Sequence, residues 1–157
     1  MATFTKNLSG KFYIQTTNVI NHIDNISHPL IIDFLFANGT TTLTQDEKEK
    51  PCPNMALLSL YEEGIIQNNP NITFCKTASS SPNKRYILYG LYILQNYKKH
   101  YKFKSEIWQD ILSLDKSSLN KEHNSQVDVL IAVWRNRHQP WCNLKILPTL
   151  AQVKAMR

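Results

Sequence analysis

The chain has 157 residues, of which 42% are hydrophobic and 19% are charged, and its formal net charge is +6. This composition excludes an intrinsically disordered chain, and the length is enough for one domain with its own core. The positive charge favours acidic partners. We expect a single domain over residues 1–157, with a β-leaning part at 1–45, a charged connector at 45–53 and a helical part at 54–157.

The chain carries three cysteines, which are scattered and too few for a disulfide framework. Its N-terminal residues lack the charged and apolar regions of a secretory signal. No apolar run approaches the ~20 residues that a membrane helix needs, so no transmembrane segment is expected. Together these observations predict an intracellular, soluble protein, placed in the cytoplasm, with reduced thiols.

The β-leaning part contains a hairpin signal. Two β-prone runs, near Leu30–Phe36 and Thr40–Thr44, are separated by Asn38-Gly39, the dipeptide that best accepts a type I′ turn. Because a two-stranded ribbon alone is marginally stable, Lys11–Thr17 is a candidate third strand. The pattern therefore predicts a small N-terminal β-hairpin or meander.

The remainder of the chain has helical patterns. Asn54 is a candidate N-cap for a first helix that ends near Gly64. An exposed excursion follows over residues 68–83, with a short strand at its NITFC segment. Tyrosine and isoleucine then recur every three or four residues from Tyr86 to Tyr101, which predicts a second, long helix. Further helices are expected to begin near Ser105, Ser125 and Pro148. The predicted fold is α+β and predominantly helical, with four or five helices after the β element.

One stretch of the chain is strongly basic. No acidic residue occurs between Glu63 and Glu106, whereas lysines are frequent there, most densely in residues 95–104. On a helix, Lys98 and Lys102 would share one face, with tyrosines on an adjacent face. Such a surface could bind phosphates or carboxylates and stack unpaired bases. The alternative is that the tyrosines pack into the core and the lysines are its solvated side. The predicted binding residues here are Lys98, Lys99, Tyr101, Lys102 and Lys104.

A second candidate lies in residues 134–142, where tryptophan and arginine are concentrated. These two residue types are enriched in the hot spots of protein interfaces. The predicted binding residues are Arg135, Arg137 and Trp141. The alternative is the C-terminal end of a helix, with Trp134 in the core and the arginines bound to the last carbonyls.

The evidence for an enzyme is weaker. Cys142 follows His138 by four residues, and a thiol paired with an imidazole is the minimum for nucleophilic cysteine chemistry. There is no metal-binding spacing of Cys and His and no phosphate loop, so neither a metal nor a cofactor is expected.

The preferred hypothesis is a non-catalytic binding or assembly protein that engages an acidic partner through its basic, aromatic-rich surface. A protein partner is favoured over nucleic acid because the chain has no RNA- or DNA-binding signature. A nucleic-acid-binding protein is one alternative. A small cysteine-dependent hydrolase or transferase using Cys142 and His138 is the other.

Overall fold

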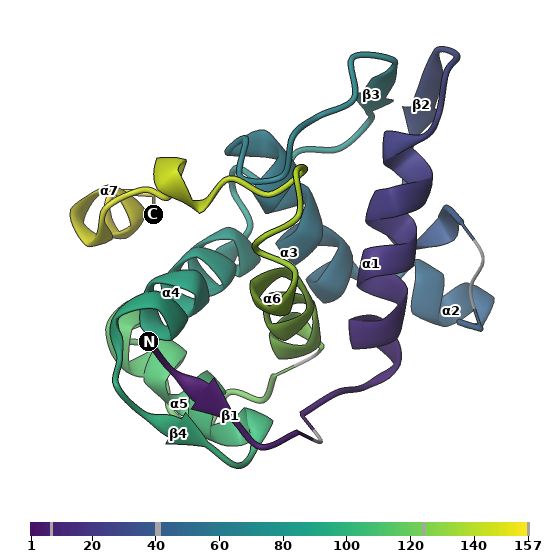
Figure 1. The fold of residues 1–157 in the computed structure, drawn as a ribbon. Helices are drawn as coiled ribbons and strands as arrows, with labels where there is room; N and C mark the ends of the chain where they lie inside the picture. Colours follow the sequence, from purple (N-terminus) through teal and green to yellow (C-terminus); the bar gives the residue numbers. More distant parts are fainter. Residues whose placement is uncertain (7, 40–41, 124, 157) are drawn as a thin grey trace.

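The computed structural model describes residues 1–6, 8–39, 42–123 and 125–156, and it is built mainly of helices (Figure 1). The helices are α1 (Lys11–Asp24), α2 (Gln45–Lys48), α3 (Pro51–Glu62), α4 (Pro82–Asn96), α5 (Lys104–Asp115), α6 (Gln126–Arg135) and α7 (Leu150–Lys154). The strands are β1 (Thr3–Phe4), β2 (Leu30–Ile32), β3 (Ile72–Phe74) and β4 (His100–Tyr101). The predicted α+β, predominantly helical fold is confirmed. None of the helices in the described ranges is long and apolar enough to cross a membrane.

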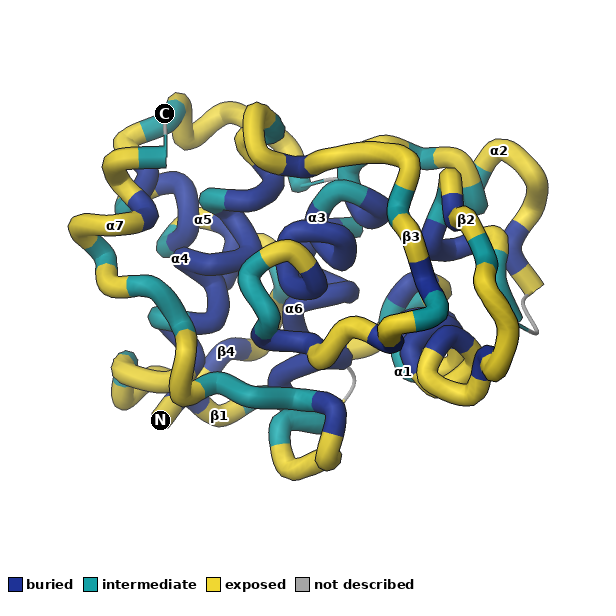
Figure 2. Tube along the Cα trace, turned by 90° about the horizontal axis from the view of Figure 1, so that it is seen from above, coloured by how far each residue is buried: buried dark blue, intermediate teal, exposed yellow. Residues whose placement is uncertain are grey.

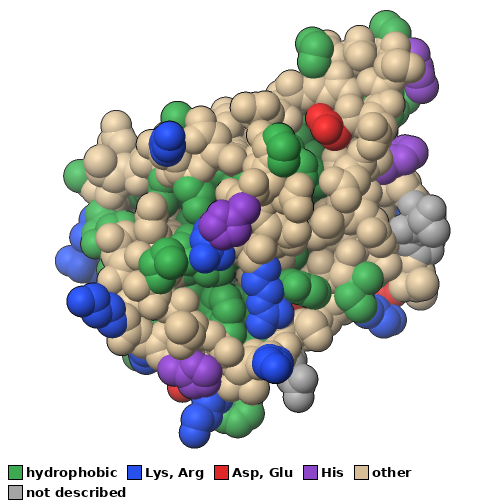
Figure 3. All heavy atoms as spheres, viewed as in Figure 1, with side chains coloured by type: hydrophobic (Ala, Val, Ile, Leu, Met, Phe, Trp, Pro, Cys, Tyr) green, Lys and Arg blue, Asp and Glu red, His purple; other side chains and the backbone are tan. Residues whose placement is uncertain are grey.

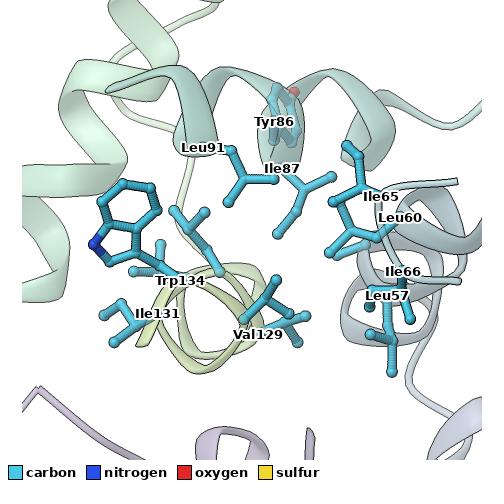
Figure 4. Close-up of a cluster of buried hydrophobic side chains, with 14 of the residues drawn as sticks. Leu57, Leu60, Ile65, Ile66, Tyr86, Ile87, Leu91, Val129, Ile131 and Trp134 are labelled. Atoms are coloured by element: carbon cyan, nitrogen blue, oxygen red, sulfur yellow. The ribbon is translucent and has the colours of Figure 1, made fainter. Parts of the chain in front are cut away.

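Helix α6 lies at the centre of the packing, in contact with α1, α3, α4 and α5. It is apolar around most of its circumference, which is typical of a helix surrounded by others. Figure 2 shows α3, α4 and α6 largely buried beneath exposed loops. Where α4 crosses α6, a Cβ atom on Gly90 would lie 2.4 Å from Cδ2 of Leu130, so any larger residue there would require the Leu130 side chain to shift. Figure 4 shows side chains of α3, α4 and α6 in this core, among them Leu57, Leu60, Ile87, Leu91, Val129, Ile131 and Trp134.

The predicted hairpin is wrong. Strand β2 pairs in parallel with β3, with Leu30 opposite Ile72, and the chain then turns into a short 3₁₀ helix at Leu35–Ala37. Leu35 and Phe36 are both buried, which a helical turn permits, whereas consecutive strand residues point to opposite faces. The side chain of Asn38 closes this turn by donating to the backbone carbonyls of Phe34 and Leu35. Of the predicted second strand, residues 40 and 41 lie outside the described residues.

Residues 11–17 form the start of helix α1 and not a strand. The buried positions of α1 follow helical spacing on one face: Phe12, Gln15, Thr16, Val19, Ile20 and Ile23. This period becomes visible only when the run is followed to residue 24, well past the segment that suggested a strand.

Helix boundaries in the helical part also differ from the prediction. Helix α3 begins at Pro51, because prolines fit the first turn, and the connector before it contains α2, which Thr44 and Glu47 cap reciprocally. Helix α4 ends at Asn96, so the predicted helix does not extend to Tyr101. Instead, residues 100–101 form β4, which pairs in parallel with β1.

Candidate binding surface at the β1–β4 corner

The N-terminal strand β1 joins the two segments that the sequence marked as candidates. On one side, the backbone N–H groups of Thr3 and Thr5 donate to the carbonyls of Lys99 and Tyr101, at 2.9 and 3.0 Å. On the other side, the guanidinium of Arg135 donates to the carbonyls of Leu8 and Thr5, at 3.3 and 3.5 Å. Segments far apart in the sequence are thereby held together by the first residues of the chain.

We name this surface the basic corner and define it by Lys98, Lys99, His100, Lys102 and Arg135. His100 is fixed on β1 because its two ring nitrogens lie 2.9 and 3.2 Å from the hydroxyls of Thr3 and Thr5. Figure 3 shows Lys, Arg and His side chains spread over the face that carries β1 and β4, with few Asp or Glu side chains visible among them. The face is therefore electropositive.

The lysines of this region differ in what they contact. Lys99 pairs with Asp110 at 2.9 Å, and Lys104 pairs with Asp128 at 2.7 Å and also donates to the carbonyl of Ser9. Lys98 and Lys102 are exposed and form no ion pair within the described part of the chain. Their charges are therefore available to a partner, whereas the ammonium of Lys104 serves the fold.

Tyr101 is a core residue and not a stacking platform. Its side chain is fully buried, and its hydroxyl donates to Asp110 at 2.5 Å. Burial, with the Asp110 carboxylate next in importance, raises the pKa of this phenol. Tyr86 and Tyr89 are buried as well, so the alternative in which the tyrosine stripe packs into the core is correct for these three residues.

The tryptophan-arginine segment is also largely structural. The guanidinium carbon of Arg135 lies 5.3 Å from the ring centre of Phe4 and 5.4 Å from that of Tyr13, within the range of cation–π contacts. Arg137 stacks on Trp134 at 4.2 Å and donates to the Trp134 carbonyl, as expected near a helix C-terminus. Trp141 is only 7% exposed, so its ring does not present a contact surface.

The cysteine alternative gains no support from the geometry. Cys142 is partly buried and lies in an isolated antiparallel bridge with Ile66. Burial raises the pKa of its thiol to about 11, against a smaller opposing effect of Arg137. His138 is exposed, and no hydrogen bond joins it to Cys142 in the described structure. Nucleophilic cysteines need a lowered pKa, so the environment of Cys142 acts in the opposite direction.

We therefore expect Cys142 to react slowly with iodoacetamide at neutral pH and faster only as the pH approaches about 11. Cys75 is exposed and should label earlier, although a hydrogen bond with Asp33 raises its pKa as well. Mass spectrometry of labelled peptides, with the denatured protein as control, measures both rates. Faster labelling of Cys142 than of Cys75 at neutral pH would support the alternative of a cysteine-dependent enzyme.

Two surface features were not anticipated from the sequence. The first is Phe103, an exposed ring at the junction of β4 and α5. The second is a hollow of about 350 Å³ beside α5, whose lining includes Ser105, Trp108, Gln109 and Leu119. The side chains of Trp108 and Gln109 donate to the carbonyls of Lys121 and Leu119, which holds the following loop over the helix. The position of such a loop has no periodic signal in the sequence.

In the described ranges, no group of three His, Cys, Asp or Glu side chains is arranged to hold a metal ion.

The chain belongs to a family of unknown function, DUF6979, whose model matches residues 33–138. No curated protein and no solved structure matches the chain. The matched residues include β4, α5 and Arg135, whereas β1 and α1 precede them. The matched region therefore includes all five residues that define the basic corner but not the strand that joins its two sides.

Proposed function

We propose that this protein is a non-catalytic binding or assembly protein whose basic corner engages an acidic protein surface. The observation that carries the proposal is the pair of exposed lysines, Lys98 and Lys102, neither of which forms an ion pair with a carboxylate of the described structure. They flank β4, whose residues His100 and Tyr101 pair with β1. A fixed group of cations steers an acidic partner and selects it over neutral ones.

Burial of the aromatic residues favours a protein over nucleic acid as the partner. Single-stranded nucleic acids are held by several exposed aromatic rings on which successive bases stack. Near the basic corner, Tyr101 is buried and Tyr97 is partly buried, whereas the ring of Phe103 is exposed. The corner therefore offers charge but no row of stacking platforms.

Reversing the free charges tests this function. We expect Lys98→Glu/Lys102→Glu to bind a fluorescent acidic peptide about tenfold more weakly than the wild type, because two attractive contacts become repulsive. Its affinity should also depend less on salt, since fewer ions are released or displaced on binding. Fluorescence anisotropy at two ionic strengths measures both effects.

The matched control is Lys48→Glu/Lys50→Glu, which changes the net charge equally but lies at α2 and the start of α3, away from β4 (Figure 1). This control should bind like the wild type. Equal weakening in both variants would mean that overall charge, and not the corner, attracts the peptide. Tighter binding of a single-stranded oligonucleotide with the same dependence on Lys98 and Lys102 would make nucleic acid the partner.

A further inference from the structure

Phe103 is exposed to an unusual degree for a ring of its size. Its exposed fraction is 65%. Among the exposed large apolar side chains of the described structure, Phe103 is the aromatic one. Single exposed apolar residues are common on protein surfaces. Phe103 differs because it directly follows Lys102, an exposed lysine that forms no ion pair in the described structure, so an apolar ring and a cation adjoin at this point of the chain.

The backbone beneath this ring is fixed on both sides. One carboxylate oxygen of Glu106 accepts hydrogen bonds from the backbone N–H groups of Lys102 and Phe103, both at 2.8 Å. These two bonds lower the pKa of Glu106, so the carboxylate that closes the cap stays ionised to a lower pH than that of an ordinary glutamate. On the other side, the buried ring of Tyr101 anchors the chain. A ring presented by a rigid backbone loses little conformational freedom on binding.

We propose that Phe103 is the apolar anchor of the basic corner and that it contacts a large apolar side chain which the partner carries among its carboxylates. This inference rests on the proposed function, because it names the kind of acidic partner that the corner binds. The cations at Lys98 and Lys102 attract the acidic segment. Phe103 then selects segments with an apolar residue, since aromatic rings that become buried supply much of the affinity at protein interfaces.

Two peptides of equal length and equal glutamate content separate the two contributions. In one peptide the remaining positions are serine, and in the other they are phenylalanine. We expect the wild type to bind the phenylalanine peptide at least about tenfold more tightly, because a hot-spot side chain contributes no less than that factor. Phe103→Ala should abolish this preference and leave the affinity for the serine peptide unchanged.

The control variant is Ile31→Ala, because Ile31 is 68% exposed but lies on β2, far from β4 in the fold (Figure 1). It should retain the full preference. A preference that survives Phe103→Ala would overturn the inference and leave the proposed function intact. The proposed function fails separately, and this inference with it, if Lys98→Glu/Lys102→Glu binds the serine peptide as well as the wild type does.

Two further probes test whether the partner of Phe103 is a peptide segment, a membrane or a nucleic acid. Vesicles containing phosphatidylserine and a single-stranded oligonucleotide are titrated with the wild type and with Phe103→Ala. Both should bind more weakly than the phenylalanine peptide and show little dependence on Phe103. If either binds more tightly and loses that binding in Phe103→Ala, the anchor serves a membrane or a base, and the assignment to a peptide segment is wrong.

Discussion

Replacing Trp134 with alanine is expected to lower the free energy of unfolding by about 3–5 kcal/mol. The ring is 3% exposed and packs at the end of α6, the helix around which the core is assembled. Removing it leaves a cavity that neighbouring helices cannot close without moving. Urea denaturation followed by circular dichroism gives the change as a shift of the midpoint.

Arg137→Ala is the matched control, because it removes the cation that stacks on Trp134 but leaves the ring in place. Its side chain is partly exposed, so we expect a loss below about 1 kcal/mol. Comparable losses in both variants would show that the guanidinium, and not the buried ring, holds this end of α6.

The second large effect is expected at the ion pair between Arg85 and Asp115. The Asp115 side chain is 1% exposed, and its Oδ1 lies 2.8 Å from Nε of Arg85, which joins α4 to the end of α5. Arg85→Met keeps the length of the side chain but removes the cation from a buried carboxylate. Loss of one partner of a buried pair costs about 3–5 kcal/mol, and we expect a decrease of that size.

The double variant Arg85→Met/Asp115→Asn tests the cause. Without the buried charge it should recover most of the stability lost in Arg85→Met, because no ionised carboxylate is then left without the Arg85 cation. Urea unfolding of both single variants and the double variant forms a cycle that gives the coupling energy. A double variant as unstable as the sum of the single variants would mean that packing, and not charge, dominates at this site.

The helices that could be predicted were those with a complete local pattern. Helix α6 is apolar at Val127 and from Val129 to Trp134, and it follows Ser125 as its N-cap residue, so both signals are local. Strand pairing could not be predicted in the same way. Leu30 pairs with Ile72 only because the intervening helices return the chain to that point, and no local pattern encodes this.

The candidate surface was predictable in charge but not in geometry. The acid-free stretch located the lysines correctly in the sequence. It did not reveal that Asp110 and Asp128, which lie outside that stretch, fold back to pair with Lys99 and Lys104. Helical spacing also did not show that α4 would end at Asn96. It did not show that Tyr101, which lies beyond that end, would be buried. Phe103 had one local signal, the glutamate three residues later that caps the start of α5.

The position of β1 has a consequence for the order of folding. Thr3 contacts His100 across 97 residues of chain, and Arg135 contacts Leu8 across 127. Contacts between such distant residues close the longest loops, and their entropic cost is recovered only after the intervening helices have packed. We therefore expect the corner to be among the last parts to form, so that a chain still folding on the ribosome would have its lysines but not the surface that arranges them. Recognition through this corner would then be confined to the completed fold.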